Sequence, residues 1–219
     1  MTQSGPTTIS SPPPREQSKG EILRTTVSAK VARLQGRALN DEASSKAELA
    51  ELRRCDPNEP GANPAVWHIT LGDLPEQLVG RGDEPTPAER AVHAALVLFA
   101  LHQQSHDDPT HRSGVSLGKA VGQLAKARSG DGSLDQATLA RFHQVALAQD
   151  FGQRLYHLRG LVVLMRTEQP TIALDYGRLA DDLWHLADPR HDHNLVLHRW
   201  GRDLHSHESD PKQPPTQEN

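Results

Sequence analysis

The stretch TPAERAVHAALVLFALHQQ, residues 86–104, decides the fold. Thr86 and Glu89 form a capping box and Pro87 lies at the first helical position, so a helix is expected to begin here. From Ala91 onwards apolar residues cover much of the helix circumference, which is typical of a helix buried in the middle of a protein. The apolar run is far shorter than the ~20 residues that a membrane span needs. The stretch therefore predicts the central helix of a bundle.

The segments on either side of it also predict helices. Apolar residues recur at spacings of three and four, and no segment alternates convincingly at period two as a strand would. These segments are 21–39, 42–54, 116–126, 134–148, 151–168, 175–186 and 192–205. We therefore expect an all-α fold, a single bundle of seven or eight helices over residues 21–207. Residues 1–20 and 208–219 are rich in polar residues and proline, so we expect disordered tails there.

Residues 56–85 carry Gly, Pro, Asn and Asp at short intervals, which predicts a long connection rather than a regular element. Trp67 and Ile69 are expected to anchor this connection on the core.

The composition excludes several classes of protein. Cys55 is the single cysteine, so neither an internal disulfide nor a zinc site of several thiolates can form. No signal-peptide pattern opens the chain, and no segment is long enough to cross a membrane. We therefore expect a cytoplasmic protein without membrane contact.

Charge is distributed unevenly along a chain whose net charge is −4. Residues 41–89 hold eleven acids and four bases, whereas residues 112–166 hold eight bases and three acids. Lys119 and Lys126 are seven apart, as are Arg159 and Arg166, so each pair returns to one face of its helix beside an apolar stripe. No aromatic residues interleave with these bases, and no base-reading motif accompanies them. The pattern favours contact with phosphate without sequence preference.

Histidines suggest a metal site that the neighbouring residues argue against. His102 and His106 are four apart, as in the H-E-x-x-H motif of zinc hydrolases, but Gln103 stands where that motif has its general base. We instead expect both imidazoles at the polar C-terminal end of the central helix, where the helix dipole favours their charge. A second group, expected to be solvated, comprises His191, His193, His198, His205 and His207. No nucleophile elbow or phosphate loop is present, so we expect no enzyme activity, no metal and no cofactor.

Seven segments resemble a known family and occur in its order. They are KAELAELRR (46–54), ERAVHAALVLFALHQQS (89–105), SLGKAVGQLA (116–125), ARFHQVALAQD (140–150), LYHLRGLVVLMR (155–166), LDYGRLADDLW (174–184) and VLHRWGRDL (196–204). Over residues 46–205 the chain is similar to the CasB family, the small subunit of the type I-E CRISPR interference complex, Cascade.

The resemblance implies an all-α, non-catalytic protein that works inside that complex. Its implied partners are the backbone and large subunits, a second copy of itself, the crRNA guide and the target DNA. It implies that the protein helps to hold the opened DNA, the R-loop with its displaced strand, by contacts to the backbone. The residues assigned to this role are Arg53, Arg54, Arg112, Lys119, Lys126, Arg128, Arg141, Arg159 and Arg166. Arg199 and Arg202 are assigned to subunit contact or to pairing with Asp203.

A second hypothesis is a free-standing dimeric regulator that binds duplex DNA. It requires a recognition helix with polar residues directed at base edges, and GKAVGQLAKARS (118–129) is the candidate.

For the phosphate contacts, we expect the cations from separate segments to form one exposed strip.

Overall fold

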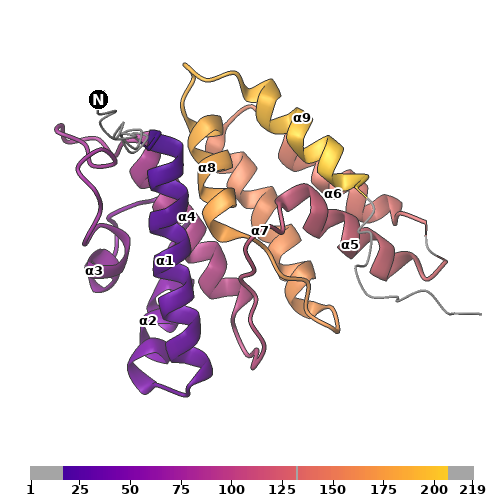
Figure 1. The fold of residues 1–219 in the computed structure, drawn as a ribbon, viewed down its shortest axis with the longest axis horizontal. Coiled ribbons are helices and arrows are strands. Elements are labelled where there is room, and N and C mark those ends of the chain that lie inside the picture. The colour runs from indigo at the N-terminus through magenta and orange to yellow at the C-terminus, as the bar shows by residue number, and fades with distance from the viewer. Residues whose placement is uncertain (1–16, 132, 207–219) are drawn as a thin grey trace, which may run out of the picture.

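Helices dominate the computed structural model, which describes residues 17–131 and 133–206 (Figure 1). All eight expected helices are present, together with a short helical turn, α3, that follows a 3-10 turn, η1 (Pro64–Val66). The helices are α1 (Lys19–Leu39), α2 (Ala43–Arg54), α3 (Trp67–Thr70), α4 (Pro87–His102), α5 (Leu117–Ser129), α6 (Gln136–Leu147), α7 (Phe151–Thr167), α8 (Tyr176–Ala187) and α9 (His193–Leu204). No strand occurs in the described ranges, so the all-α prediction is confirmed.

Side-chain caps explain where most helices begin. At α4 the predicted capping box is complete: Glu89 N–H donates to Thr86 Oγ1 (3.1 Å), and Thr86 N–H donates to Glu89 Oε2 (2.7 Å). Six other helices begin after a residue whose side chain accepts a backbone N–H: Ser18, Ser116, Asp135, Asp150, Asp175 and Asp192. The helix starts are therefore encoded locally.

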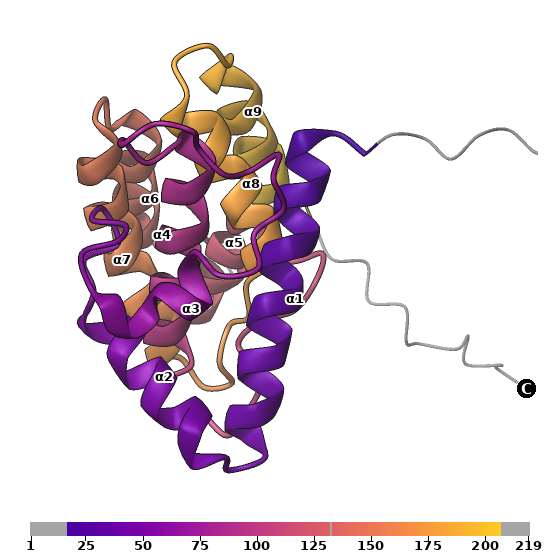
Figure 2. The same ribbon diagram turned by 90° about the vertical axis from the view of Figure 1, so that its left-hand side faces the viewer.

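Helix α4 lies at the centre, as its sequence predicts. Thirteen of its sixteen residues are buried, and it packs against α1, α2, α3, α7 and α8 (Figures 1 and 2). No helix among the described residues is both long and apolar enough to cross a membrane.

Helices α5, α6, α7 and α9 form the other side of the bundle (Figure 1). Helix α5 lies directly against α9 because glycines face it: a Cβ on Gly118 would lie 2.2 Å from the carbonyl oxygen of Trp200. A Cβ on Gly122 would lie 2.7 Å from the carbonyl oxygen of Leu204. Helix α7 contacts α4, α5 and α6 and so joins the two sides of the bundle.

Two connections, residues 103–116 and 168–175, lie side by side and hydrogen-bond through their backbones. Leu174 N–H donates to Thr110 O (2.9 Å) and Arg112 N–H donates to Leu174 O (3.2 Å). The first of these connections is also hydrogen-bonded to α1, since Gln35 Oε1 accepts the His111 N–H (2.7 Å).

The connection over residues 56–85 differs from the prediction at one of its two anchors. Ile69 is buried, but Trp67 is 46% exposed and its indole N–H donates to Gly61 O (2.8 Å). Val66 is buried in its place. The turn is helical here, so residues three apart share a face and the residue between them points away. Val66 and Ile69 therefore face the core while Trp67 faces outward.

The N-terminal boundary also differs slightly from the expected one. Helix α1 begins at Lys19, two residues before the predicted start, because Ser18 Oγ accepts the Glu21 N–H (3.2 Å). Residues 1–16 and 208–219 of the predicted tails lie outside the described residues.

Candidate nucleic-acid interface

Four of the predicted contact residues gather where the C-terminus of α2 meets α7. A hollow of about 420 Å³ opens there on the surface. Its polar and aromatic lining comprises Arg53, Arg54, Asp56, Asn58, Tyr156 and Arg159. Arg166 lies two helical turns beyond Arg159 on α7 and close enough to Arg53 for their charges to interact. We call this surface the α2–α7 groove and define it by Arg53, Arg54, Arg159 and Arg166.

The groove carries positive charge that the described part of the chain leaves largely uncompensated. Three arginines and one aspartate, Asp56, line the hollow, which is a net charge of +2. Among the described residues no carboxylate forms an ion pair with Arg53 or Arg159. Burial, and then the like charge of Arg166, lower the pKa of Arg53. Because a guanidinium stays protonated even so, an anion placed here would relieve the repulsion.

The remaining two arginines of the groove have partners of different strength. Arg166 Nη1 donates to the neutral amide oxygen of Gln104 (2.7 Å), which fixes the side chain without neutralising it. Arg54 forms an ion pair with Glu51 on its own helix, and the Arg54 side chain is largely exposed. An exposed pair of this kind is weak, so Arg54 can exchange Glu51 for a phosphate at little cost.

The other five predicted residues lie elsewhere, so the nine do not form one strip. Lys119 and Lys126 are on α5 and Arg141 is on α6, at the opposite end of the bundle from α2 (Figure 1). Arg128 at the end of α5 pairs with Glu168 (2.6 Å), and Arg112 is exposed in a connection. The seven-residue spacing is right for each helix, but it does not tell which helices are neighbours.

One basic residue counted in the positive segment belongs to the core. Arg154 on α7 is 5% exposed, and its guanidinium donates to the carbonyl oxygens of Val145 (2.7 Å), Ala146 (3.1 Å) and Ala148. It therefore satisfies the C-terminus of α6, and burial lowers its pKa. Its charge is not available to a partner.

An aromatic residue that the sequence reading missed lies among the bases. Tyr156 lines the hollow beside Arg159, and it is 74% exposed. The expectation that no aromatic accompanies the cations is therefore wrong at this groove. The signal was present in LYHLRG, since residues three apart on a helix lie on the same face.

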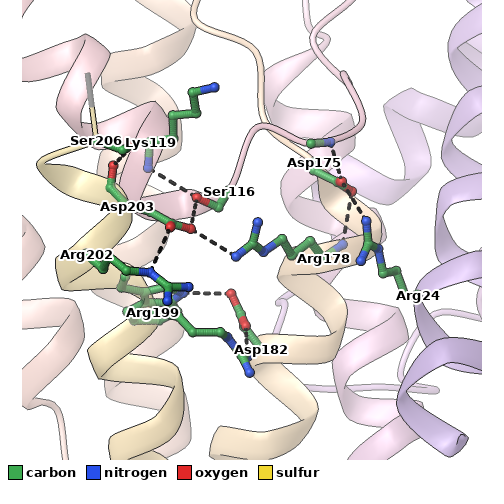
Figure 3. A network of polar contacts seen from close by, with 12 residues as sticks. Arg24, Ser116, Lys119, Asp175, Arg178, Asp182, Arg199, Arg202, Asp203 and Ser206 are labelled. Carbon is green, nitrogen blue, oxygen red and sulfur yellow. Dashed lines mark hydrogen bonds and ion pairs between the residues drawn. The ribbon is translucent and has the colours of Figure 1, made fainter. Parts of the chain in front are cut away.

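The arginines near the C-terminus contact aspartates inside the bundle (Figure 3). Arg199 pairs with Asp182, which is 1% exposed, and Arg178 pairs with Asp203 (2.9 Å). Arg202 Nε lies 3.9 Å from Asp203 Oδ1, which agrees with the predicted pairing of Arg202 with Asp203. Burial raises the pKa of Asp182, against the opposing effect of Arg199. The pairs of Arg199 with Asp182 and of Arg178 with Asp203 connect α8 to α9, so they hold the fold together.

The HQQSH segment is engaged by the protein itself. His102 is fully buried, with Nδ1 2.9 Å from the Tyr176 hydroxyl, and burial lowers its pKa to about 3. The expectation that the helix end favours a charged imidazole is therefore wrong for His102, because loss of hydration outweighs the dipole. His106 lies beyond the helix and contacts Arg166 O (2.8 Å). Gln103 Nε2 donates to the carbonyl oxygens of His106 and Asp108 (3.0 Å each).

The histidines near the C-terminus are not all solvated, contrary to expectation. The His191 ring packs on Trp184 and on His185, with ring centres 4.7 and 4.6 Å apart, and burial lowers its pKa. His207 lies outside the described residues. Across residues 17–131 and 133–206 no group of three or more His, Cys, Asp or Glu side chains could hold a metal ion.

Comparison with known proteins agrees with the resemblance in the sequence. The profile of the family described as CRISPR-associated protein Cse2 matches residues 48–205. The crystal structure of CasB from Thermobifida fusca is 30% identical, with a TM-score of 0.69 over 84% of this chain and 98% of that one. A CRISPR-associated protein of the Cse2 family from Thermus thermophilus is 26% identical, with a TM-score of 0.57 over 86% of this chain and 98% of that one. No curated protein sequence matches.

Proposed function

Since the chain belongs to the Cse2 family of CRISPR-associated proteins, we propose that it is the non-catalytic small subunit of a type I-E Cascade complex. In this role it stabilises crRNA-guided binding of target DNA, in defence against viruses, through contacts to the phosphates of the opened DNA. Its partners are the backbone and large subunits and a second copy of itself. The observation that carries the nucleic-acid role is the α2–α7 groove, whose Arg53 and Arg159 form no ion pair within the described residues.

The chemistry of the groove suits phosphate better than base edges. Guanidinium groups offer several N–H donors to phosphate oxygens and carry a permanent charge. Base reading in duplex DNA requires a helix or ribbon that enters the major groove, whereas these arginines line a hollow between two helices. Such contacts hold a backbone of any sequence, while pairing with the guide reads the sequence.

The alternative of a free-standing regulator is disfavoured by the connection before α5. A helix-turn-helix joins its two helices by a turn of three or four residues. Here α4 ends at His102 and α5 begins at Leu117, with residues 103–116 between them. Competition by duplexes of scrambled sequence separates the two functions, because a regulator prefers its operator and the proposed subunit has no preference.

The salt dependence of target binding tests the proposal in the assembled complex. We expect the tagged chain to co-purify with the other subunits and the crRNA. Each contact to a phosphate of a single strand contributes about −0.7 to the slope of log K against log salt. Arg53→Ala and Arg159→Ala are each expected to flatten the slope by about 0.7, whereas the double variant Lys119→Ala/Lys126→Ala flattens it by about 1.4 if both lysines contact phosphate.

The control is Arg81→Ala, which removes one exposed arginine from the connection over residues 56–85, outside the groove. It is expected to leave the slope unchanged. An unaltered slope in both groove variants, in complexes of normal composition, would refute the phosphate contacts.

A further inference from the structure

Tyr156 is a large aromatic side chain that has no packing role in the described bundle. The apolar stripe of α7 runs through Leu155, Leu158 and Val162, all of which are buried. Tyr156 lies outside this stripe and is 74% exposed, with the centre of its ring 5.4 Å from that of His157 in a T-shaped arrangement. Its ring is therefore available at the surface of the molecule.

Its neighbours show what kind of partner would cover it. Arg159 lies one turn further along α7, and Arg53 at the end of α2 lines the same hollow. The centres of protein–protein interfaces are depleted of charge, whereas this surface places three arginines around one tyrosine. Flat aromatic rings set among cations are the arrangement by which proteins hold unpaired nucleic acid, with bases stacked and phosphates neutralised.

Building on the nucleic-acid role proposed above, we propose that Tyr156 stacks with an unpaired base while Arg53 and Arg159 hold the flanking phosphates. The bases of a duplex are already stacked on each other, so a base that reaches Tyr156 must belong to a single strand. The hollow of about 420 Å³ has the size of a small-ligand site, which suits one nucleotide and not a duplex. Stacking depends on the π-face that every base has, so the site has no preference for sequence.

Binding of labelled oligothymidylate to the full chain, followed by fluorescence anisotropy at low salt, tests this assignment. Tyr156→Ala is expected to weaken binding about 5- to 150-fold, the effect of losing one stacked base. The slope of log K against log salt stays unchanged, because the side chain carries no charge. Tyr156→Phe keeps the ring and is expected to bind like the wild type. Leu195→Ala, a truncation of an exposed apolar residue on α9, is the matched control and leaves binding unchanged.

An abasic strand of the same length separates stacking from phosphate contact. It presents the phosphates without bases, so the wild type and Tyr156→Ala are expected to bind it equally. If Tyr156→Ala binds oligothymidylate as tightly as the wild type while Arg53→Ala and Arg159→Ala flatten the salt slope, stacking is refuted and the phosphate contacts stand. If the wild type shows no salt-dependent binding at all, both are refuted. If Tyr156→Ala lowers only co-purification with the other subunits, the ring is a protein contact and stacking is refuted.

Discussion

Lowering the pH from about 7.5 to about 5.5 is expected to destabilise the protein through His102, which the fold keeps uncharged. The imidazole is completely buried at the end of α4, with Nδ1 beside the Tyr176 hydroxyl and Nε2 without a hydrogen-bond partner among the described residues. Burial, and then electrostatic interaction with His106 and Arg166, lower its pKa to about 3. As the pH falls below about 6.5, the imidazole therefore binds a proton in the unfolded chain but stays neutral in the native state.

The magnitude follows from the two pKa values. In the unfolded chain the histidine has its ordinary pKa of about 6.5. Between about 6.5 and about 3 the unfolded state binds one more proton than the native state, so the free energy of unfolding decreases as the pH falls through this window. At about pH 5.5 the loss from His102 is about 1.4 kcal/mol relative to about pH 7.5. Burial also lowers the pKa of His93 and His111, so both add losses of the same sign.

Urea unfolding at several pH values, compared between the wild type and His102→Gln, measures this contribution. Glutamine offers the Tyr176 hydroxyl a hydrogen-bond partner but does not titrate. The variant is expected to be less stable at neutral pH and to lose about 1.4 kcal/mol less than the wild type on acidification to about pH 5.5. His143→Gln, at an exposed position on α6, is the control and should follow the wild type. Parallel curves for His102→Gln and the wild type would show that His102 is not held neutral.

Three further changes test the packing of the helices by thermal or urea unfolding. Gly118→Ala is expected to lower the free energy of unfolding by about 1–3 kcal/mol, because its Cβ would lie 2.2 Å from Trp200 O. The control Gly160→Ala, where a Cβ would meet nothing among the described residues within 4 Å, should leave the free energy of unfolding unchanged or raise it by up to about 1 kcal/mol. Equal effects of the two substitutions would contradict the close contact of α5 with α9. Arg154→Met should cost about 2–4 kcal/mol by leaving the carbonyl groups at the end of α6 without donors, and a neutral result would contradict that capping role. Thr86→Ala should cost about 1 kcal/mol through loss of the α4 cap, and an unchanged midpoint would refute it.

The helices could be predicted from the sequence because their signals are local. Thr86 with Glu89, and Ser116 before α5, each place a hydrogen-bond acceptor next to backbone N–H groups a few residues away. The apolar periodicity then indicates which face is buried. Trp67 shows the limit of this reasoning, because a turn of four residues is too short for a periodicity to be recognised.

The candidate site could be predicted only in part, because it depends on which helices are neighbours. Arg159 and Arg154 are both bases on α7, and periodicity does not separate them, because each lies four residues from a buried leucine: Leu158 for Arg154 and Leu155 for Arg159. Likewise, nothing local indicates that Arg53 on α2 meets α7, or that Lys119 on α5 lies away from it. Such information is carried by the packing of the whole bundle.

The position of the groove makes the proposed binding of a polyanion compatible with a net charge of −4. Part of the acidic segment pairs with bases close to it: Glu42 and Glu48 pair with Arg37, and Asp41 pairs with Lys46. Salt screens charges over ~10 Å, so a bound strand responds to the groove and not to the total. The cations that the fold uses for its own stability are fixed by carbonyl groups or carboxylates. Arg53 and Arg159 have no carboxylate partner in the described structure, so their charge contributes little to the stability of the fold. If that charge serves phosphate binding, replacing either arginine by alanine should weaken DNA binding and leave the free energy of unfolding unchanged.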